Sequence, residues 1–163
     1  MSDLDDACAE YLQLRDRCRS VQLATINDEA RPEASYAPCV WHGSDCYLFL
    51  SGLSSHTDNL LSHPRISLLL LDDSAAGANA FARKRASLHG VAEVIERNDV
   101  LFARIMQEFH QSFGKVMQLL EPLPDFRLFR INTTSGSFVR GFGQAFEIFG
   151  ADMNQLRHVD PRQ

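Results

Sequence analysis

The fold class is decided by the stretch at residues 20–41, which reads SVQLATINDEARPEASYAPCVW. Val21, Leu23 and Thr25 lie two residues apart, which is the period of a strand with one buried face. The turn-forming residues 27–32 follow, and a second strand-like run comes after them. The stretch therefore predicts two antiparallel strands joined by a turn, close to the start of the chain.

The rest of the chain continues this pattern of short strands. Beyond the first strand, strands are predicted at residues 33–41, 46–50, 65–71, 86–96, 126–132, 137–142 and 145–149. Gly90 is expected to mark a bulge in its strand. Because strands do not alternate with helices and no segment repeats, a doubly wound sheet is disfavoured. The pattern favours a closed antiparallel barrel with flanking helices.

Three helices are predicted outside the strands. The first lies within residues 1–19 and begins with a capping box at Ser2. A short second helix starts after Ser54, and a longer third helix at about residues 98–120 has Asn98 as its N-cap. The first helix is amphipathic, and the third has a buried stripe that includes Leu101, Ile105 and Phe109.

Composition and charge narrow the class of ligand. The chain has 163 residues, of which 45% are hydrophobic, so it can bury a full core. The net charge of −5 argues against nucleic acid or an anionic membrane as a partner, since either needs a basic surface. No signal segment or spanning apolar run is visible. We therefore expect a cytoplasmic protein with a small-molecule ligand.

Several motifs, in their order along the chain, resemble the haem iron-utilisation group of the pyridoxamine 5′-phosphate oxidase-like superfamily. The first motifs are QLATI at 22–26 and SYAP at 35–38, followed by the segment 51–61 with HPRISL at 63–68. The later motifs are FARKRASL at 81–88, DFRLFR at 125–130 and FVRGFGQA at 138–145. The resemblance covers about residues 18–150.

This resemblance implies a mainly β protein with flanking helices, a split β-barrel of the FMN-binding type with an antiparallel, Greek-key-like order. It implies a single domain over residues 1–163, with the N-terminal helix at 1–19 and the barrel at 20–150. The helix at about 98–120 is inserted in the barrel, and residues 151–163 form a C-terminal tail. Members of the group build each cofactor site from two chains, so a homodimer is expected.

FMN is one cofactor that the resemblance implies. Its phosphate needs N–H donors or cations, and its ring needs strand backbone beside it. The candidate phosphate ligands cluster around one turn and helix start, and they are Ser51, Ser54, Ser55, His56 and Asn59. By resemblance, the segment Ser35, Tyr36 and Ala37 runs under the ring. Simple helix capping is the alternative role for the serines.

Two departures from the oxidases predict weak flavin binding. Where the oxidases place an arginine at the start of the second strand, this chain has Ala34 and Ser35. Where they place a lysine after the serine of the phosphate turn, it has His56, which carries less positive charge at neutral pH. We expect the protein to take up FMN only when FMN is supplied in excess.

A second candidate anion site lies at residues 83–85. If this segment is a strand, alternation points Arg83 and Arg85 to one face and Lys84 to the other. Two guanidinium groups on one face can grip a phosphate, a propionate or a carboxylate. The alternative is an ordinary solvated run of charge.

Haem is the other cofactor that the resemblance implies. Haem iron needs an axial imidazole, and its propionates need Arg or Lys. His158 is the candidate ligand, because haem-degrading relatives place theirs in a C-terminal loop after the last strand. Asp125 is the candidate residue that orients this imidazole. A solvent-exposed His158 without a ligand is the alternative.

Three functions are therefore compared. The first is a protein that binds haem, FMN or both at a dimer interface and supports haem degradation for iron use. The second is a flavin-dependent oxidoreductase that acts on another small substrate. The third is a non-catalytic cofactor binder.

Overall fold

The computed structural model describes residues 2–75 and 79–159. Its strands form one antiparallel sheet in the order β3-β2-β1-β4-β5-β6-β7-β8, and an additional pairing of β3 with β6 closes a barrel. The strands are β1 (Ser20–Ile26), β2 (Pro32–His42), β3 (Asp45–Leu50), β4 (Arg65–Leu71), β5 (Arg85–Ile95), β6 (Arg127–Gly141), β7 (Gln144–Phe149) and β8 (Gln155–His158). The predicted mainly β, antiparallel barrel with flanking helices is confirmed.

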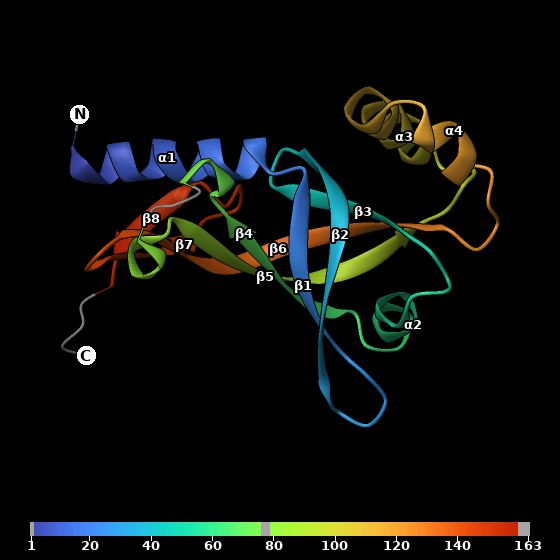
Figure 1. Ribbon diagram of the computed structural model, residues 1–163, viewed down its shortest axis with the longest axis horizontal. Helices are drawn as coiled ribbons and strands as arrows, with labels where there is room; N and C mark the ends of the chain where they lie inside the picture. The colour runs from blue at the N-terminus through green and yellow to red at the C-terminus, as the bar shows by residue number, and fades with distance from the viewer. Residues whose placement is uncertain (1, 76–78, 160–163) are drawn as a thin grey trace.

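The helices occupy three places around the barrel (Figure 1). They are α1 (Asp3–Arg17), α2 (Ser55–Ser62), α3 (Val100–Phe113) and α4 (Val116–Leu120), with short 3-10 turns at Asp73–Ala75 and Ala80–Ala82. Helix α1 packs on β8, β6 and β4 at one end of the long axis, whereas α2 and the α3–α4 pair lie at the other end (Figure 1). The long strands β5 and β6 connect the two ends.

The core has two parts because helices cover the barrel at both ends. Under α1, Tyr11 packs against Phe138, and Phe138 stacks on Phe146. Under α3, Phe109 and Phe102 pack against Phe49 of β3. All five phenylalanines and Tyr11 are buried. In β1 the expected alternation holds, with Val21, Leu23 and Thr25 buried and the residues between them exposed.

Gly90 marks the predicted bulge in β5. The pairing of β5 with β6 shifts register between His89 and Gly90. A Cβ atom at Gly90 would lie 2.4 Å from the carbonyl oxygen of Asn132, so only glycine allows the two strands to approach this closely.

The predicted helix at about 98–120 is wrong in two respects. Asp99, not Asn98, is the N-cap, and its side chain accepts a hydrogen bond from the Leu101 N–H. The helix also ends at Phe113, because Gly114 adopts a positive φ of 69° and reverses the chain into α4.

Two expectations about the last strands also need correction. Residues 126–142 are predicted to hold two strands, but β6 runs from Arg127 to Gly141, because its polar middle pairs with β5. The expected C-terminal tail contains β8, which pairs with β7 and buries Leu156. The sequence QLRH of β8 is too short and too polar to show a strand period.

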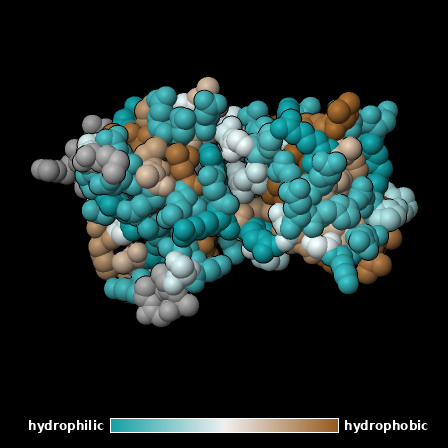
Figure 2. Space-filling view, turned by 90° about the horizontal axis from the view of Figure 1, so that it is seen from above, coloured by the Kyte–Doolittle hydropathy of each residue, from teal (hydrophilic) through white to brown (hydrophobic). Residues whose placement is uncertain are grey.

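The surface on the side of α1 and α3 is mostly hydrophilic (Figure 2). Exposed apolar side chains on α3 and α4 include Val100, Val116 and Leu119. Among the described residues, no helix is long and apolar enough to cross a membrane.

Candidate functional site

The turn between β3 and α2 is held by its own polar groups. The Ser51 hydroxyl donates to a carboxylate oxygen of Asp125 at 2.9 Å, and the Gly52 N–H donates to the Asp125 carbonyl at 2.9 Å. The Thr57 hydroxyl donates to the Ser51 carbonyl at 2.6 Å. Ser51 and Asp125, which are far apart in sequence, therefore lie together beside the start of α2.

Ser54 and Ser55 begin α2 as predicted. Ser54 occupies the N-cap position, but its side chain makes no capping hydrogen bond. Its N–H donates to the Ser51 carbonyl at 3.2 Å, which continues the turn. The Ser54 hydroxyl is therefore not committed to capping, the alternative role that the sequence left open for it.

His56 does not face solvent as a phosphate-binding cation does. Its side chain is buried, and its Nδ1 atom is hydrogen-bonded to the Ser35 hydroxyl at 2.9 Å. Burial lowers the pKa of His56, because the charged imidazolium is poorly solvated there. At neutral pH His56 is therefore an uncharged partner of Ser35.

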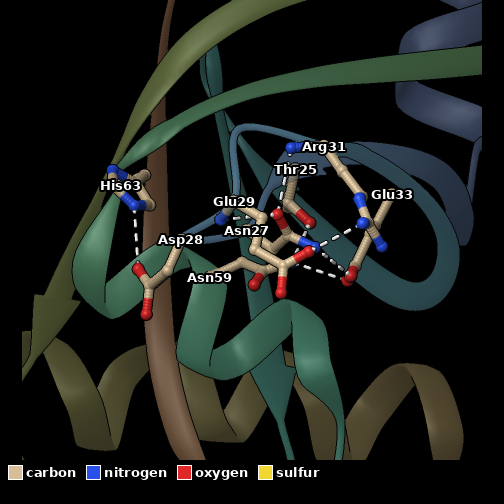
Figure 3. A network of polar contacts seen from close by, with 8 residues as sticks. All are labelled: Thr25, Asn27, Asp28, Glu29, Arg31, Glu33, Asn59 and His63. Carbon is tan, nitrogen blue, oxygen red and sulfur yellow. Dashed lines mark hydrogen bonds and ion pairs between the residues drawn. The ribbon is translucent and has the colours of Figure 1, made fainter.

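Asn59 belongs to a polar network that ties α2 to β1 and β2 (Figure 3). Its side-chain amide donates to the Thr25 hydroxyl at 3.0 Å and to the Glu33 carboxylate at 2.8 Å. Glu33 also accepts a hydrogen bond from Asn27 at 2.9 Å. Hydrogen bonds from Asn59, Asn27 and Ser55 hold the pKa of Glu33 below its usual value, so this carboxylate stays charged.

The segment proposed to run under a flavin ring divides between two faces of β2. Ser35 and Ala37 point to the inner side, where Ser35 meets His56 and Ala37 is buried. Tyr36 points outward and is 59% exposed. Tyr36 lies opposite Gln22, which in turn lies opposite Leu69 of β4, so all three share the outer face of the barrel.

The cation run does not have the expected strand geometry. Strand β5 begins at Arg85, so Arg83 and Lys84 precede it and the alternation argument fails for them. Arg83 contacts the Asp73 carboxylate at 3.2 Å, and Lys84 forms an ion pair with Glu10 of α1 at 2.6 Å. Arg85 donates to the Arg83 carbonyl at 2.9 Å. Arg83 and Lys84 are thus already paired with carboxylates, and Lys84 ties β5 to α1.

His158 lies in β8 rather than in a loop. It pairs with Phe146, and the two rings are 4.6 Å apart between centroids. The imidazole is exposed, and its nitrogens have no hydrogen-bond partner among the described residues.

Within one chain the candidate residues fall into two groups. His158 lies in β8 and Arg85 at the start of β5, both at the α1 end of the molecule (Figure 1). Asp125, which is bonded to Ser51 and Gly52, lies at the α2 end. The structure therefore does not bring His158 and Asp125 together in a single chain.

Comparison with known proteins settles the family. The family model of pyridoxamine 5′-phosphate oxidase matches residues 4–140. The chain belongs to the pyridoxamine 5′-phosphate oxidase family. Its split-barrel class is thereby confirmed together with the closed barrel.

The relatives of this family member include proteins named for haem. Heme oxygenase HutZ of Vibrio cholerae is 33% identical over 151 residues, which cover 93% of this chain and 86% of HutZ. The crystal structure of HutZ, there called the heme storage protein, has a TM-score of 0.71 at 29% identity, covering 88% of this chain and 96% of HutZ. ChuZ of Campylobacter jejuni has a TM-score of 0.87 at 28% identity, covering 100% of this chain and 68% of ChuZ. The resemblance to the haem-utilisation group is confirmed.

Glu33 is the site residue that the sequence analysis missed. It stands two residues before Ser35 on the same face of β2, and it lies directly opposite the buried Thr25. The alternation of β2 could have placed Glu33 beside Ser35. Its contact with Asn59 could not be foreseen, because it depends on how α2 packs on the hairpin.

Proposed function

We propose that this protein binds haem in a site shared between two copies of the chain, and that it supports opening of the porphyrin for iron use. The observation that carries the proposal is the relationship to HutZ, which extends over 93% of the chain. The geometry of the β3–α2 turn argues against FMN, because its nearby side chains are two carboxylates and a neutral imidazole. A phosphate group is bound by positively charged side chains, and carboxylates repel it.

The residues at the α1 end fit haem. The His158 imidazole has no hydrogen-bond partner among the described residues, so a ring nitrogen is available to iron. Its ring packs on the buried Phe146, which holds the exposed imidazole in place at the surface. Bound haem supplies an iron atom that exchanges electrons and binds dioxygen. The chain itself would supply the ligand, His158, positioned by its packing on Phe146.

His158 and Asp125 lie at opposite ends of one chain, and this separation supports a site built from two chains. In a two-fold dimer, the α1 end of one chain can meet the α2 end of the other, and the symmetry then creates two equal sites. His158 of one chain would face Asp125 of the other, whose carboxylate can accept a hydrogen bond from the imidazole N–H. The outer face of β1 and β4 offers the required apolar surface, with Ile26 42% exposed and a groove of about 470 Å³ beside it. Light scattering that shows only monomer at micromolar concentration would contradict this arrangement.

A haem titration of the purified protein tests the proposal. We expect a saturable change in the haem absorption spectrum in the wild type, and loss of that spectrum in His158→Ala because the axial ligand is gone. His63→Ala is the matched control, since His63 is also exposed but pairs with Asp28 at 3.0 Å. An unchanged spectrum in His158→Ala would overturn the assignment of the ligand, and the absence of saturable haem binding would overturn the function.

Storage without chemistry is the second candidate, and the description of HutZ as a heme storage protein favours it. The two candidates differ once an electron donor and dioxygen are added to the haem complex. Opening of the porphyrin predicts decay of the haem band together with release of chelatable iron. Storage predicts that the band and the iron both remain with the protein.

A further inference from the structure

The start of α2 carries negative charge where a phosphate clamp carries positive charge. The Glu33 carboxylate reaches from β2 to α2, where it accepts hydrogen bonds from Asn59 and Asn27 (Figure 3). Asp125 adds a second carboxylate through its bond to Ser51. In the described ranges 2–75 and 79–159, neither carboxylate forms an ion pair. Their charge is therefore not neutralised by a neighbouring cation there.

Glu33 is held in this position rather than free to turn away. Asn59 is 7% exposed, and among the described residues its amide donates to two acceptors, Thr25 and Glu33. If the Glu33 side chain moved out to make room for a phosphate, the buried Asn59 amide would lose one of them, which is costly for a buried donor. A phosphate at the start of α2 would thus meet a fixed negative charge.

We infer that Glu33 is a selectivity residue that excludes phosphate from the start of α2. The chain then discriminates against phosphorylated planar cofactors, such as FMN or pyridoxamine 5′-phosphate, at the turn where its fold offers a helix N-terminus. The Glu33 carboxylate lies where the anionic group of such a ligand would have to bind. This inference concerns α2 alone, and it holds whether or not the chain binds haem.

FMN and riboflavin provide the direct test, because they differ only in the phosphate. The affinity of each is measured by quenching of flavin fluorescence for the wild type, Glu33→Gln and Glu29→Gln. Glu29 is the matched control, since it lies in the turn just before β2 and loses the same charge but is exposed and paired with Arg31. We expect the wild type to bind FMN no more tightly than riboflavin. Glu33→Gln should raise the preference for FMN about fivefold or more, and Glu29→Gln should leave it unchanged.

Two outcomes with the flavins overturn the inference. It fails if the wild type already prefers FMN strongly, or if the two variants change the preference equally. Where neither flavin binds measurably, inorganic phosphate is titrated while the amide NMR signals of Ser55 and His56 are followed. Glu33→Gln should then show a saturable shift that the wild type lacks, and equal responses overturn the inference. Glu33→Ser provides a second uncharged variant if the glutamine variant does not fold.

Discussion

His56 shows how one buried side chain changes the chemistry of a turn. A lysine at this position would bring a full charge to the start of α2, whereas His56 is buried against Ser35 and its pKa is lowered. Its identity is visible in the sequence, and so is the loss of charge relative to lysine. Its burial was not predictable, since it depends on the packing of α2 over Ser35.

The lowered pKa of His56 predicts a pH dependence of stability. Below the ordinary histidine pKa of 6.5 the unfolded chain takes up a proton before the folded chain does, so stability falls as the pH decreases through this value. We expect wild type to lose more free energy of unfolding between pH 7.5 and pH 5.5 than His56→Gln, measured by urea denaturation. Ser35→Ala should keep the loss, because burial and not the hydrogen bond lowers the pKa. Equal losses in wild type and His56→Gln would contradict this explanation.

The elements differ in how well their sequences define them. The hairpin of β1 and β2 and the capping box at Ser2 are local patterns, and both are present where expected. Strand β8 and the uninterrupted β6 are not local, because they form by pairing with strands that already exist. The end of α3 at Gly114 is also not visible in the local pattern, because the apolar period of the helix continues past this residue. Tertiary pairing thus decided the elements that the local pattern left ambiguous.

The close approach of β5 and β6 at Gly90 predicts that these two strands pack together only with glycine at this position. Gly90→Ala would place a methyl group 2.4 Å from the Asn132 carbonyl oxygen, so the strands must separate. We expect a loss of about 1–3 kcal/mol in the free energy of unfolding, as for overpacked sites. In Gly141→Ala the new methyl group meets no atom within 4 Å, and we expect a change of about 0.5 kcal/mol or less. Similar melting temperatures for the two variants would show that β5 can move away.

At the scale of the molecule, the long axis separates the two halves of the proposed haem site. His158 and Asp125 are candidates from the sequence, but only the fold shows that they lie at opposite ends of one chain (Figure 1). That separation follows from β5 and β6, which span both ends, and from β8, which adds to the sheet under α1. A site that joins His158 and Asp125 would therefore need two chains, which the sequence motifs alone do not reveal.

Mixing two defective variants tests this shared site most directly. In a dimer of His158→Ala with Asp125→Asn, one site keeps both His158 and Asp125 and the other site keeps neither. Our account predicts that each variant alone gives an altered haem spectrum, and that the refolded mixture regains wild-type haem sites, which only its mixed dimers contain. It would be contradicted if the mixture gave only the sum of the two defective spectra, because His158 and Asp125 would then not meet across two chains.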